Sequence, residues 1–364
     1  MLETKTIETD KLGVGIDKSD VSSESTVNSL QLDEMDLALV NAMQINGRAS
    51  WSLIGKALGI SPATAARRWN RLSQEGIAWV TAYGGPAIWE TNCLAFVEVD
   101  CVVGSSQSVA TTIASHPYAA SVEFAAGGAN LFVTTVISDL SALSNYVRNR
   151  VSALEGVIAT RVHLATRVYT EASKWRLRSL SQDQQEVLAP PAPTGESEAQ
   201  LFAEDHPLLV SLGLDGRKSC ADLAKELGVS TSTVRRRLER LVQTDAIRFR
   251  CDVASSYTTW PVLVNYQAAC PPAEIDFVGR TLSSLPEIRV CAATLDAHNM
   301  SFTVWLRSTS SSLALEEELS QRLPQLDIRG RTVTLHSLKR FGRLLDERGR
   351  SVGAVPMDMW RAVG

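Results

Sequence analysis

Residues 229–241 read Val-Ser-Thr-Ser-Thr-Val-Arg-Arg-Arg-Leu-Glu-Arg-Leu, and this stretch decides how the rest of the chain is interpreted. Ser230 is a suitable helix N-cap, and apolar residues recur after it at i, i+4 and i+7, which predicts one stripe of an amphipathic helix. Residues 222–227 predict a short helix that Gly228 ends. A short helix, a glycine turn and a second helix with cationic outer positions are typical of a helix-turn-helix.

The same design occurs earlier in the chain, at a shift of 216 − 47 = 169 residues that aligns Gly47 with Gly216. The shift holds without a gap between residues 32–72 and 201–241. The core positions of the two second helices differ in size, whereas four outer positions are identical. This identity suggests that both copies meet the same kind of anionic surface. The identical positions are Thr64, Arg67, Arg68 and Arg71 in the first copy and Thr233, Arg236, Arg237 and Arg240 in the second.

These outer positions and the two caps are the candidate DNA-binding residues. The alternative is a solvated helix face held by pairs such as Arg235 with Glu239. The turn before each helix and the repetition favour DNA binding. The candidate set is Ser61, Thr64, Arg67, Arg68, Arg71, Ser230, Thr233, Arg235, Arg236, Arg237 and Arg240.

Composition limits the class of protein. A chain of 364 residues, 45% of them hydrophobic, suggests two or more domains with ordinary cores. The formal charge of −4 argues against a generally basic surface, but not against local basic helices. Six scattered cysteines without a Cys-x-x-Cys pair favour a reduced, cytoplasmic chain with buried thiols. No apolar run reaches the length of a membrane span, and the start of the chain has no signal-peptide pattern.

Between the helical regions the pattern changes to strand, helix, strand, strand, helix, strand. This order spans residues 88–176 and returns in residues 258–340. Gly127-Gly128 lies between two strands, as in a hairpin turn. Asn130 matches Asn299 at the shift of 169, so the duplication covers whole units. Two βαβ-type units in this order make a ferredoxin-like sandwich, with helices on one face of an antiparallel sheet.

The predicted fold class is therefore α+β, with two helix-turn-helix domains each followed by a ferredoxin-like βαββαβ sandwich. We expect the two sandwiches to pair face to face within one chain, since each alone would leave an apolar sheet surface in water. The expected segments are a disordered leader (1–30), helix-turn-helix domains (31–80 and 201–250), sandwiches (88–176 and 258–340), an extended proline-rich linker (177–200) and a tail (341–364).

Several motifs resemble the Lrp/AsnC family of transcriptional regulators. Leu32-Asp33-x-x-Asp36, Asn46-Gly47-Arg48, Leu53-Ile54-Gly55 and Gly59-Ile60-Ser61 look like that family's N-terminal domain. The βαββαβ unit is similar to the family's effector-binding and oligomerisation domain. Such regulators usually carry one copy and pair as dimers, so this chain resembles a dimer fused through the linker. The resemblance implies double-stranded DNA as a partner and a homo-oligomer, a dimer or tetramer of the tandem chain.

The resemblance also implies that effectors, typically amino acids, bind near the loop between the second and third strands of each sandwich. The alternative is that these are hairpin residues chosen for positive φ. The candidate effector-binding residues are Gly127, Gly128 and Asn130 in the first copy and Asp296, His298 and Asn299 in the second.

We therefore predict a sequence-specific DNA-binding transcriptional regulator that responds to a small molecule such as an amino acid. The five histidines lie one to a segment without metal or triad spacing, so no catalytic residue, metal or cofactor is expected. Siroheme decarboxylases resemble the same arrangement, and of their hairpin signature this chain carries only Asn130-Leu131-Phe132. An architectural DNA-binding protein that ignores small molecules is a third reading.

Overall fold

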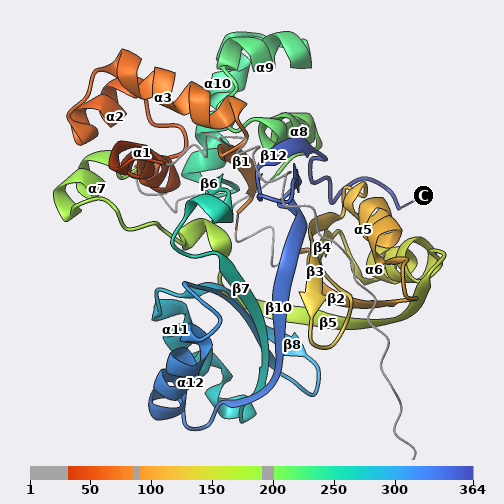
Figure 1. The fold of residues 1–364 in the computed structure, drawn as a ribbon. Helices are drawn as coiled ribbons and strands as arrows, with labels where there is room; N and C mark the ends of the chain where they lie inside the picture. Colours follow the sequence, from red (N-terminus) through yellow and green to blue (C-terminus); the bar gives the residue numbers. More distant parts are fainter. Residues whose placement is uncertain (1–31, 86–90, 191–200, 364) are drawn as a thin grey trace, which may run out of the picture. The chain divides into compact units, whose positions relative to one another are not determined.

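Residues 32–85, 91–190 and 201–363 are described by the computed structural model, and the predicted leader lies outside them. Each helix-turn-helix region holds three helices followed by a strand (Figure 1). The predicted second and third helices of the later copy are confirmed within two residues at each end. The first region contains α1 (Glu34–Ile45), α2 (Trp51–Leu58), α3 (Pro62–Gln74) and β1 (Ala78–Gly84), and the second contains α8 (His206–Leu214), α9 (Cys220–Leu227), α10 (Thr231–Gln243) and β6 (Ile247–Val253).

Two β-rich units follow the predicted element order. Where one helix was expected at 140–154, the chain forms a short α-helix that continues as a π-helical turn. The first unit contains β2 (Cys93–Cys101), α5 (Ser106–Ala114), β3 (Ala119–Ala126), β4 (Leu131–Ile137), α6 (Leu140–Asn145), η1 (Tyr146–Val151) and β5 (Val157–Thr170). The second contains β7 (Val262–Ala269), α11 (Ile275–Ser284), β8 (Ile288–Leu295), β9 (Met300–Leu306), α12 (Ser311–Arg322) and β10 (Asp327–Arg340). Short 3-10 turns lie at Ala172–Lys174, Ala203–Asp205, Ser255–Tyr257 and Pro272–Glu274.

The two four-stranded sheets share their long strands. β5 pairs with β2 over its first half and with β8 of the other unit over its second half. β10 pairs in the same way, first with β7 and then with β3. Leu164 lies opposite Leu295 and Val333 opposite Ala126, which is one pairing repeated at the shift of 169. Because β10 also pairs with β7, these eight strands form one closed sheet.

The expected contact between the two sandwiches within one chain is confirmed, but its geometry differs from the prediction. The sheets meet through hydrogen-bonded edges and not only through apposed faces. The cause is the length of β5 and β10, which have 14 residues each. Their second halves extend past their own sheets, and an edge strand presents unpaired N–H and C=O groups that another strand can satisfy.

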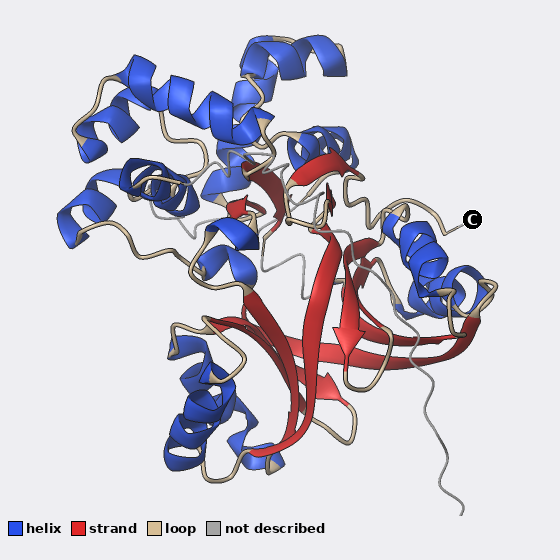
Figure 2. Ribbon diagram, viewed as in Figure 1, coloured by secondary structure: helices blue, strands red, loops and turns tan. Residues whose placement is uncertain are grey.

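Helices cover the outer faces of the closed sheet (Figure 2). The first unit packs α5 and α6 over a core that includes Val97 and Ile113. The second packs α11 and α12 over a core that includes Tyr266 and Leu319. A third apolar cluster, around Phe96, lines the inner face. The alternation of side chains along each strand therefore divides the residues between helix-facing cores and an enclosed interior.

The segment expected to be an extended linker contains a helix, α7 (Gln182–Leu188), so that prediction is wrong for this part of it. Ser181 and Gln184 form a capping box, a signal that the proline-rich composition concealed. Gln184 Nε2 donates to the carbonyl of Ala57 at 3.1 Å, and Leu188 is fully buried. Residues 191–200, with much of the proline-rich stretch, lie outside the described residues.

The tail, for which the sequence indicated no docking place, extends the sheet. It forms β11 (Arg343–Leu345), which pairs with β10, and β12 (Ser351–Ala354), which pairs with β11. Met359 is buried in the inner apolar cluster, and Tyr118 Oη donates to the carbonyl of Ala362 at 2.7 Å. The tail is therefore part of the folded unit.

Candidate nucleic-acid interface

The two predicted recognition helices, α3 and α10, begin with the same cap. Ser61 Oγ accepts a hydrogen bond from Thr64 N at 3.1 Å, and Ser230 Oγ accepts one from Thr233 N at 3.1 Å. In each pair the two hydroxyl oxygens also lie 2.8 Å apart. Four of the predicted DNA-binding residues therefore shape the start of the recognition helices, and their identity in both copies has a structural cause.

Three of the predicted outer arginines form ion pairs with buried aspartates, and Arg68 Nη1 lies 2.8 Å from Asp36 Oδ1. Arg71 forms an ion pair with Asp36, and Arg240 forms one with Asp205. The two aspartate side chains are 1% and 0% exposed. The side chains of Arg71 and Arg240 are 40% and 33% exposed, so they face outward only in part, and they hold the region preceding the turn against each recognition helix. Without the arginine, a buried carboxylate would lose its counter-charge.

Arg68 and Arg237 are also engaged within the chain. Arg68 Nη1 lies 2.8 Å from Asp33 Oδ2. In the second copy Phe202 stands at the position of Asp33, and Arg237 Nη1 donates to the carbonyl of Glu204 at 3.0 Å. Both side chains are half-buried, so they too face outward only in part.

Arg67, Arg235 and Arg236 are exposed on the recognition helices. None of the three forms an ion pair with any residue that the structure describes, and the alternative pair of Arg235 with Glu239 is not formed. Arg67 and Arg236 correspond at the shift of 169. Among the repeated arginines, this is the pair whose repetition is not explained by a contact within the described part of the chain.

Two reciprocal arginine contacts, called here the arginine exchange, join the helix-turn-helix regions. Arg48 Nη1 donates to the carbonyl of Gly216 at 2.6 Å, and Arg217 Nη1 donates to the carbonyl of Gly47 at 2.7 Å. The two arginines correspond at the shift of 169, so each copy gives the other the same contact. Sequence reasoning missed this contact, although the signal was present in the repeated Gly-Arg pair.

The same junction requires a close backbone approach. A Cβ on Gly216 would lie 2.7 Å from Val80 Cγ1 and 3.0 Å from the backbone carbon of Val80, which leaves room for glycine alone. Next to it, β1 and β6 pair antiparallel with Thr81 opposite Arg250, two residues that correspond at the shift of 169. The pairing is thus centred on equivalent positions, and it fixes the two regions to each other.

We predict that replacing Arg217 with alanine destabilises the protein. The change removes the hydrogen bond to Gly47 and the stacking of the guanidinium over Trp51, whose centroid lies 4.2 Å away. Hydrogen bonds from charged donors contribute about 1.5–3 kcal/mol, so the free energy of unfolding should fall by that amount in urea denaturation. Arg148→Ala, at an exposed arginine on η1, is the control. An Arg217→Ala variant as stable as this control would contradict the importance of the exchange.

The asparagine of each predicted effector loop fixes the loop by a hydrogen bond to the backbone of a neighbouring strand end. Asn130 Oδ1 accepts from Cys101 N at 2.7 Å, and Asn299 Oδ1 accepts from Cys270 N at 3.0 Å. Gly127 has φ +128, where a Cβ would lie 2.9 Å from the carbonyl oxygen of Arg331. These contacts favour the turn-forming interpretation for the asparagines and for Gly127. A Cβ on Gly128 would meet open space, and the carbonyl of His298 accepts from Thr294 Oγ1 at 2.6 Å.

Asp296 belongs to a polar cluster that spans both β-rich units. It bonds His163 Nδ1, and His163 Nε2 lies 3.7 Å from Glu98 Oε1. Gln267 Nε2 donates to the same Glu98 oxygen at 2.8 Å. Bonding to His163 lowers the pKa of Glu98 to about 2, against the effect of burial. Bonding to Glu98 and Asp296 raises the pKa of His163 above 6.5, although burial opposes the charged form.

We predict that this cluster stabilises the protein most at mildly acidic pH. Since the folded-state pKa of His163 is raised, its contribution is complete below about 6.5 and is lost as the pH rises through the folded-state value. The contribution of Glu98 is complete above about 4.5 and is lost as the pH falls toward 2. Relative to the parent, His163→Gln should therefore unfold more easily at pH 6, and the difference should shrink at pH 9. A difference in unfolding free energy that is independent of pH would contradict this assignment.

Other kinds of site have little support in the described residues. Across residues 32–85, 91–190 and 201–363, no three His, Cys, Asp or Glu side chains are grouped so that they could hold a metal ion. The six cysteines carry free thiols, and four of them are buried. None of the described helices is both long enough and apolar enough to span a membrane.

Two family models match the chain. The model of the AsnC-type helix-turn-helix domain matches residues 32–73 and again residues 205–242, which hold α1–α3 and α8–α10. The model of the Lrp/AsnC ligand binding domain matches residues 94–175, which hold the strands β2–β5.

Similar proteins include an uncharacterized HTH-type transcriptional regulator of Pyrococcus horikoshii, 26% identical over 147 residues that cover 40% of this chain and 90% of the relative. The leucine-responsive regulatory protein of Escherichia coli is 26% identical over 137 residues, covering 36% of this chain and 84% of the relative. A solved structure of the siroheme decarboxylase NirDL with an iron-uroporphyrin III analogue has a TM-score of 0.55 at 14% identity, covers 85% of this chain and 93% of that one, and is similar in fold alone. The doubled helix-turn-helix match and the ligand-binding match, together with these relatives, support an Lrp/AsnC-type transcriptional regulator.

Proposed function

We propose that this chain is a sequence-specific DNA-binding regulator. Its single polypeptide carries two recognition helices, the number that a dimer of single-copy regulators would have. The observation that carries the proposal is the repetition of Arg67 and Arg236. Both are exposed on the helix after a glycine turn, and packing within the described residues does not explain them. A guanidinium in this setting suits phosphate oxygens, or a guanine edge that it can bind with two hydrogen bonds.

The proposed domains are the helix-turn-helix units at 31–80 and 201–250 and the ferredoxin-like units at 88–176 and 258–340. The strand order β5-β2-β4-β3 in one unit and β10-β7-β9-β8 in the other supports this tandem arrangement. Dimeric helix-turn-helix proteins read two half-sites about one helical turn apart, or a multiple of it. Here Arg235 and Glu239 correspond to Ala66 and Asn70, so we expect half-sites of unequal sequence and tighter binding by the second helix.

The test is to replace Arg67 and Arg236 separately with alanine and to measure affinity for a selected DNA site at several salt concentrations. A lost phosphate contact should flatten the plot of log affinity against log salt by about 0.9. A lost guanine contact should cost about 1–3 kcal/mol and relax one position of the site. Arg148→Ala is the matched control, since it removes an exposed arginine from a helix outside both helix-turn-helix units.

If both variants bind DNA with the same affinity and the same salt dependence as the parent, DNA recognition by these helices loses its support. Equal affinity of the parent for every DNA sequence, with footprints extending along the duplex, would instead indicate the architectural reading. Binding confined to a selected site is the result that the proposal requires.

Replacing Arg240 should affect the stability of the fold, unlike replacing Arg236. Arg240→Ala leaves Asp205 buried without its ion pair, so we predict a loss of about 1–3 kcal/mol in the free energy of unfolding. Arg236→Ala should change stability by less than about 0.5 kcal/mol, since the side chain is exposed. Thermal and urea denaturation distinguish the two. Equal stability of both variants would show that the Arg240–Asp205 pair contributes nothing to folding.

Response to an amino acid or other small effector is part of the proposal, with the two turns at Gly127-Gly128 and Asp296–Asn299 as its sites. Assembly into dimers or tetramers of the tandem chain is a further part. The match to the model of the Lrp/AsnC ligand binding domain supports the first part, and the resemblance to that family suggests the second. Repeating the DNA titration with single amino acids added tests the first, and the mass of the particle in solution tests the second.

The likeness to a siroheme decarboxylase assigns no reaction to this chain, because at 14% identity it concerns the fold. The regulator and the enzyme differ in a simple observable, since an enzyme of that class would carry or bleach a coloured tetrapyrrole. Absorption spectra of the purified protein, with and without added tetrapyrrole, separate the two readings.

A further inference from the structure

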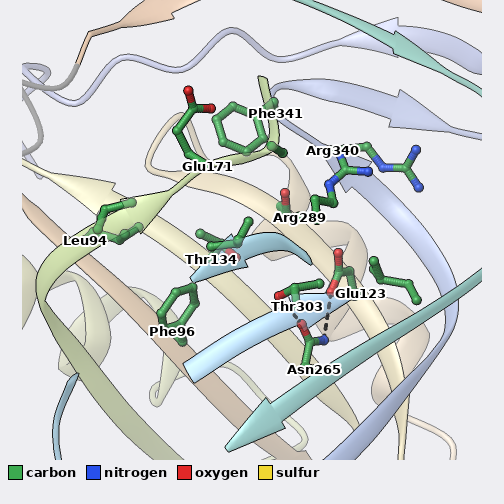
Figure 3. A pocket seen from close by; sticks show the side chains of 15 residues that line it. Leu94, Phe96, Glu123, Thr134, Glu171, Asn265, Arg289, Thr303, Arg340 and Phe341 are labelled. Carbon is green, nitrogen blue, oxygen red and sulfur yellow. Dashed lines mark hydrogen bonds between the residues drawn. The ribbon is translucent and has the colours of Figure 1, made fainter. Parts of the chain in front are cut away.

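The two copies have changed independently even where they lie close together. A cavity of about 60 Å³ inside the closed sheet is lined by side chains of both β-rich units (Figure 3). Leu94 corresponds to Leu263 at the shift of 169, whereas Phe96 corresponds to Asn265. In a fused pair, a residue kept in both copies is expected to meet a requirement that both halves share, and a residue that differs is free to serve one half alone.

The two recognition helices can be compared in this way on one shared face. In each helix one side is buried in the core, and the two arginines that bond to the region before the turn occupy one flank. Beside them lies a further face, called the open face. Its four positions follow the spacing i, i+3, i+4 and i+7, with which a recognition helix in the major groove presents side chains to bases. The open face consists of Ala63, Ala66, Arg67 and Asn70 in α3 and of Ser232, Arg235, Arg236 and Glu239 in α10.

Only one position of the open face is the same in both copies, and it is occupied by Arg67 and Arg236. Phosphates lie along DNA of every sequence, whereas base edges differ from one sequence to another. A repeated arginine therefore suits a contact that both half-sites offer. The other three positions have diverged, which suits half-sites that differ in sequence.

The diverged residues of α10 are not explained by contacts within the described chain. Arg235 and Glu239 are exposed, and neither side chain forms a hydrogen bond or an ion pair with a residue that the structure describes, although they lie one helical turn apart. Their equivalents in α3, Ala66 and Asn70, are uncharged. Asn70 is likewise exposed, without a side-chain hydrogen bond in the described part of the chain.

The charge of Glu239 limits what it can contact. It lines a hollow beside Phe249, and its side chain is exposed. On a helix that approaches phosphates, a carboxylate is repelled unless a hydrogen-bond donor lies opposite it. In the major groove the amino group of cytosine is a donor that suits a carboxylate. Arg235 has the opposite requirement, and the O6 and N7 acceptors of guanine satisfy a guanidinium with two hydrogen bonds.

We propose that the chain recognises an asymmetric operator, in which Arg235 and Glu239 select a guanine and a cytosine in one half-site and Asn70 selects an adenine in the other. The amide of Asn70 can bind N6 and N7 of adenine together. Ala66 carries no polar group, so the half-site under α3 does not require a guanine at the position equivalent to that of Arg235. The inference rests on the proposed DNA-binding function and specifies the DNA sequence that it would read.

The test is selection of binding sites from random DNA by the full chain and by two double variants. Ala66→Arg with Asn70→Glu gives α3 the diverged pair of α10, and Arg235→Ala with Glu239→Asn does the reverse. Since β1 and β6 pair antiparallel about equivalent positions, a local twofold axis relates the two copies, and matched helices should select an inverted repeat. The parent should select an asymmetric site. The first variant should select the guanine and the cytosine in both half-sites, and the second should select the adenine in both.

Each double variant should bind its own selected site at least about fivefold more tightly than the parental site, because a mismatched base contact costs about that factor or more. Glu75→Thr is the matched control, since it also removes a difference between the copies but lies at the end of α3, outside the open face. It should select the parental site. Ala66 is half-buried, so the variant that shortens Arg235 and Glu239, which are both exposed, is the deciding one.

An inverted repeat selected by the parent would overturn the proposal. If the parent and both double variants select the same asymmetric site, the assignment to these residues is wrong, while DNA recognition by the chain stands. A parent that enriches no sequence would overturn the proposed function itself, and this inference with it.

Discussion

The sharing of β5 and β10 between the two sheets is the constraint on which the structure depends. A strand of 14 residues spans about 46 Å at roughly 3.3 Å per residue. It is longer than the eight- and nine-residue strands β2, β3, β7 and β8 with which β5 and β10 pair. The surplus half carries backbone N–H and C=O groups that need partners. Each surplus half finds them on the edge strand of the other unit, and because both exchanges occur, the sheet closes and neither β3 nor β8 is left as a free edge.

Closure creates an interior, and the interior explains the unusual number of buried charges. The strand faces that in a single unit would meet solvent or a partner are enclosed here, so polar side chains on them must find partners within the chain. Arg289 on β8 contacts Asp252, which comes from β6 outside the closed sheet, and Glu98 on β2 contacts His163 and Gln267. Several of these contacts cross between the units. The helix-turn-helix regions depend on the same closure, since β1 and β6 and the exchange of Arg48 and Arg217 can form only when the two copies are adjacent.

Periodicity and duplication predicted the element order because they depend on local pattern. The helices α9 and α10, the βαββαβ order and the shift of 169 could all be read from residue spacing.

The orientation of the arginines could not be read in the same way, since Arg67 and Arg71 lie one turn apart on the same helix and differ only in what packs against them. The partner of Arg71 is Asp36, 35 residues earlier. Its equivalent Asp205 was visible at the shift of 169, and a search for repeated opposite charges would have found the pair. Edge pairing was missed because it depends on strand length relative to neighbouring strands, which periodicity does not give.

Fusion of two copies in one chain also removes a restriction that symmetry imposes. In a dimer of identical chains, a cavity on the twofold axis must present the same side chains from both sides. Here equivalent positions around the cavity have diverged: Phe96 corresponds to Asn265, and Ala120 corresponds to Arg289. Glu171 corresponds to Arg340, and Glu123 corresponds to Ala292. Each substitution puts charge or polarity on one side without repeating it on the other. A symmetric interior with the same residues would hold each arginine twice, at a larger cost of desolvation and repulsion. The duplicated chain can therefore keep a polarised interior that a pair of identical subunits could not, because its two halves can change independently while the shared strands keep them paired.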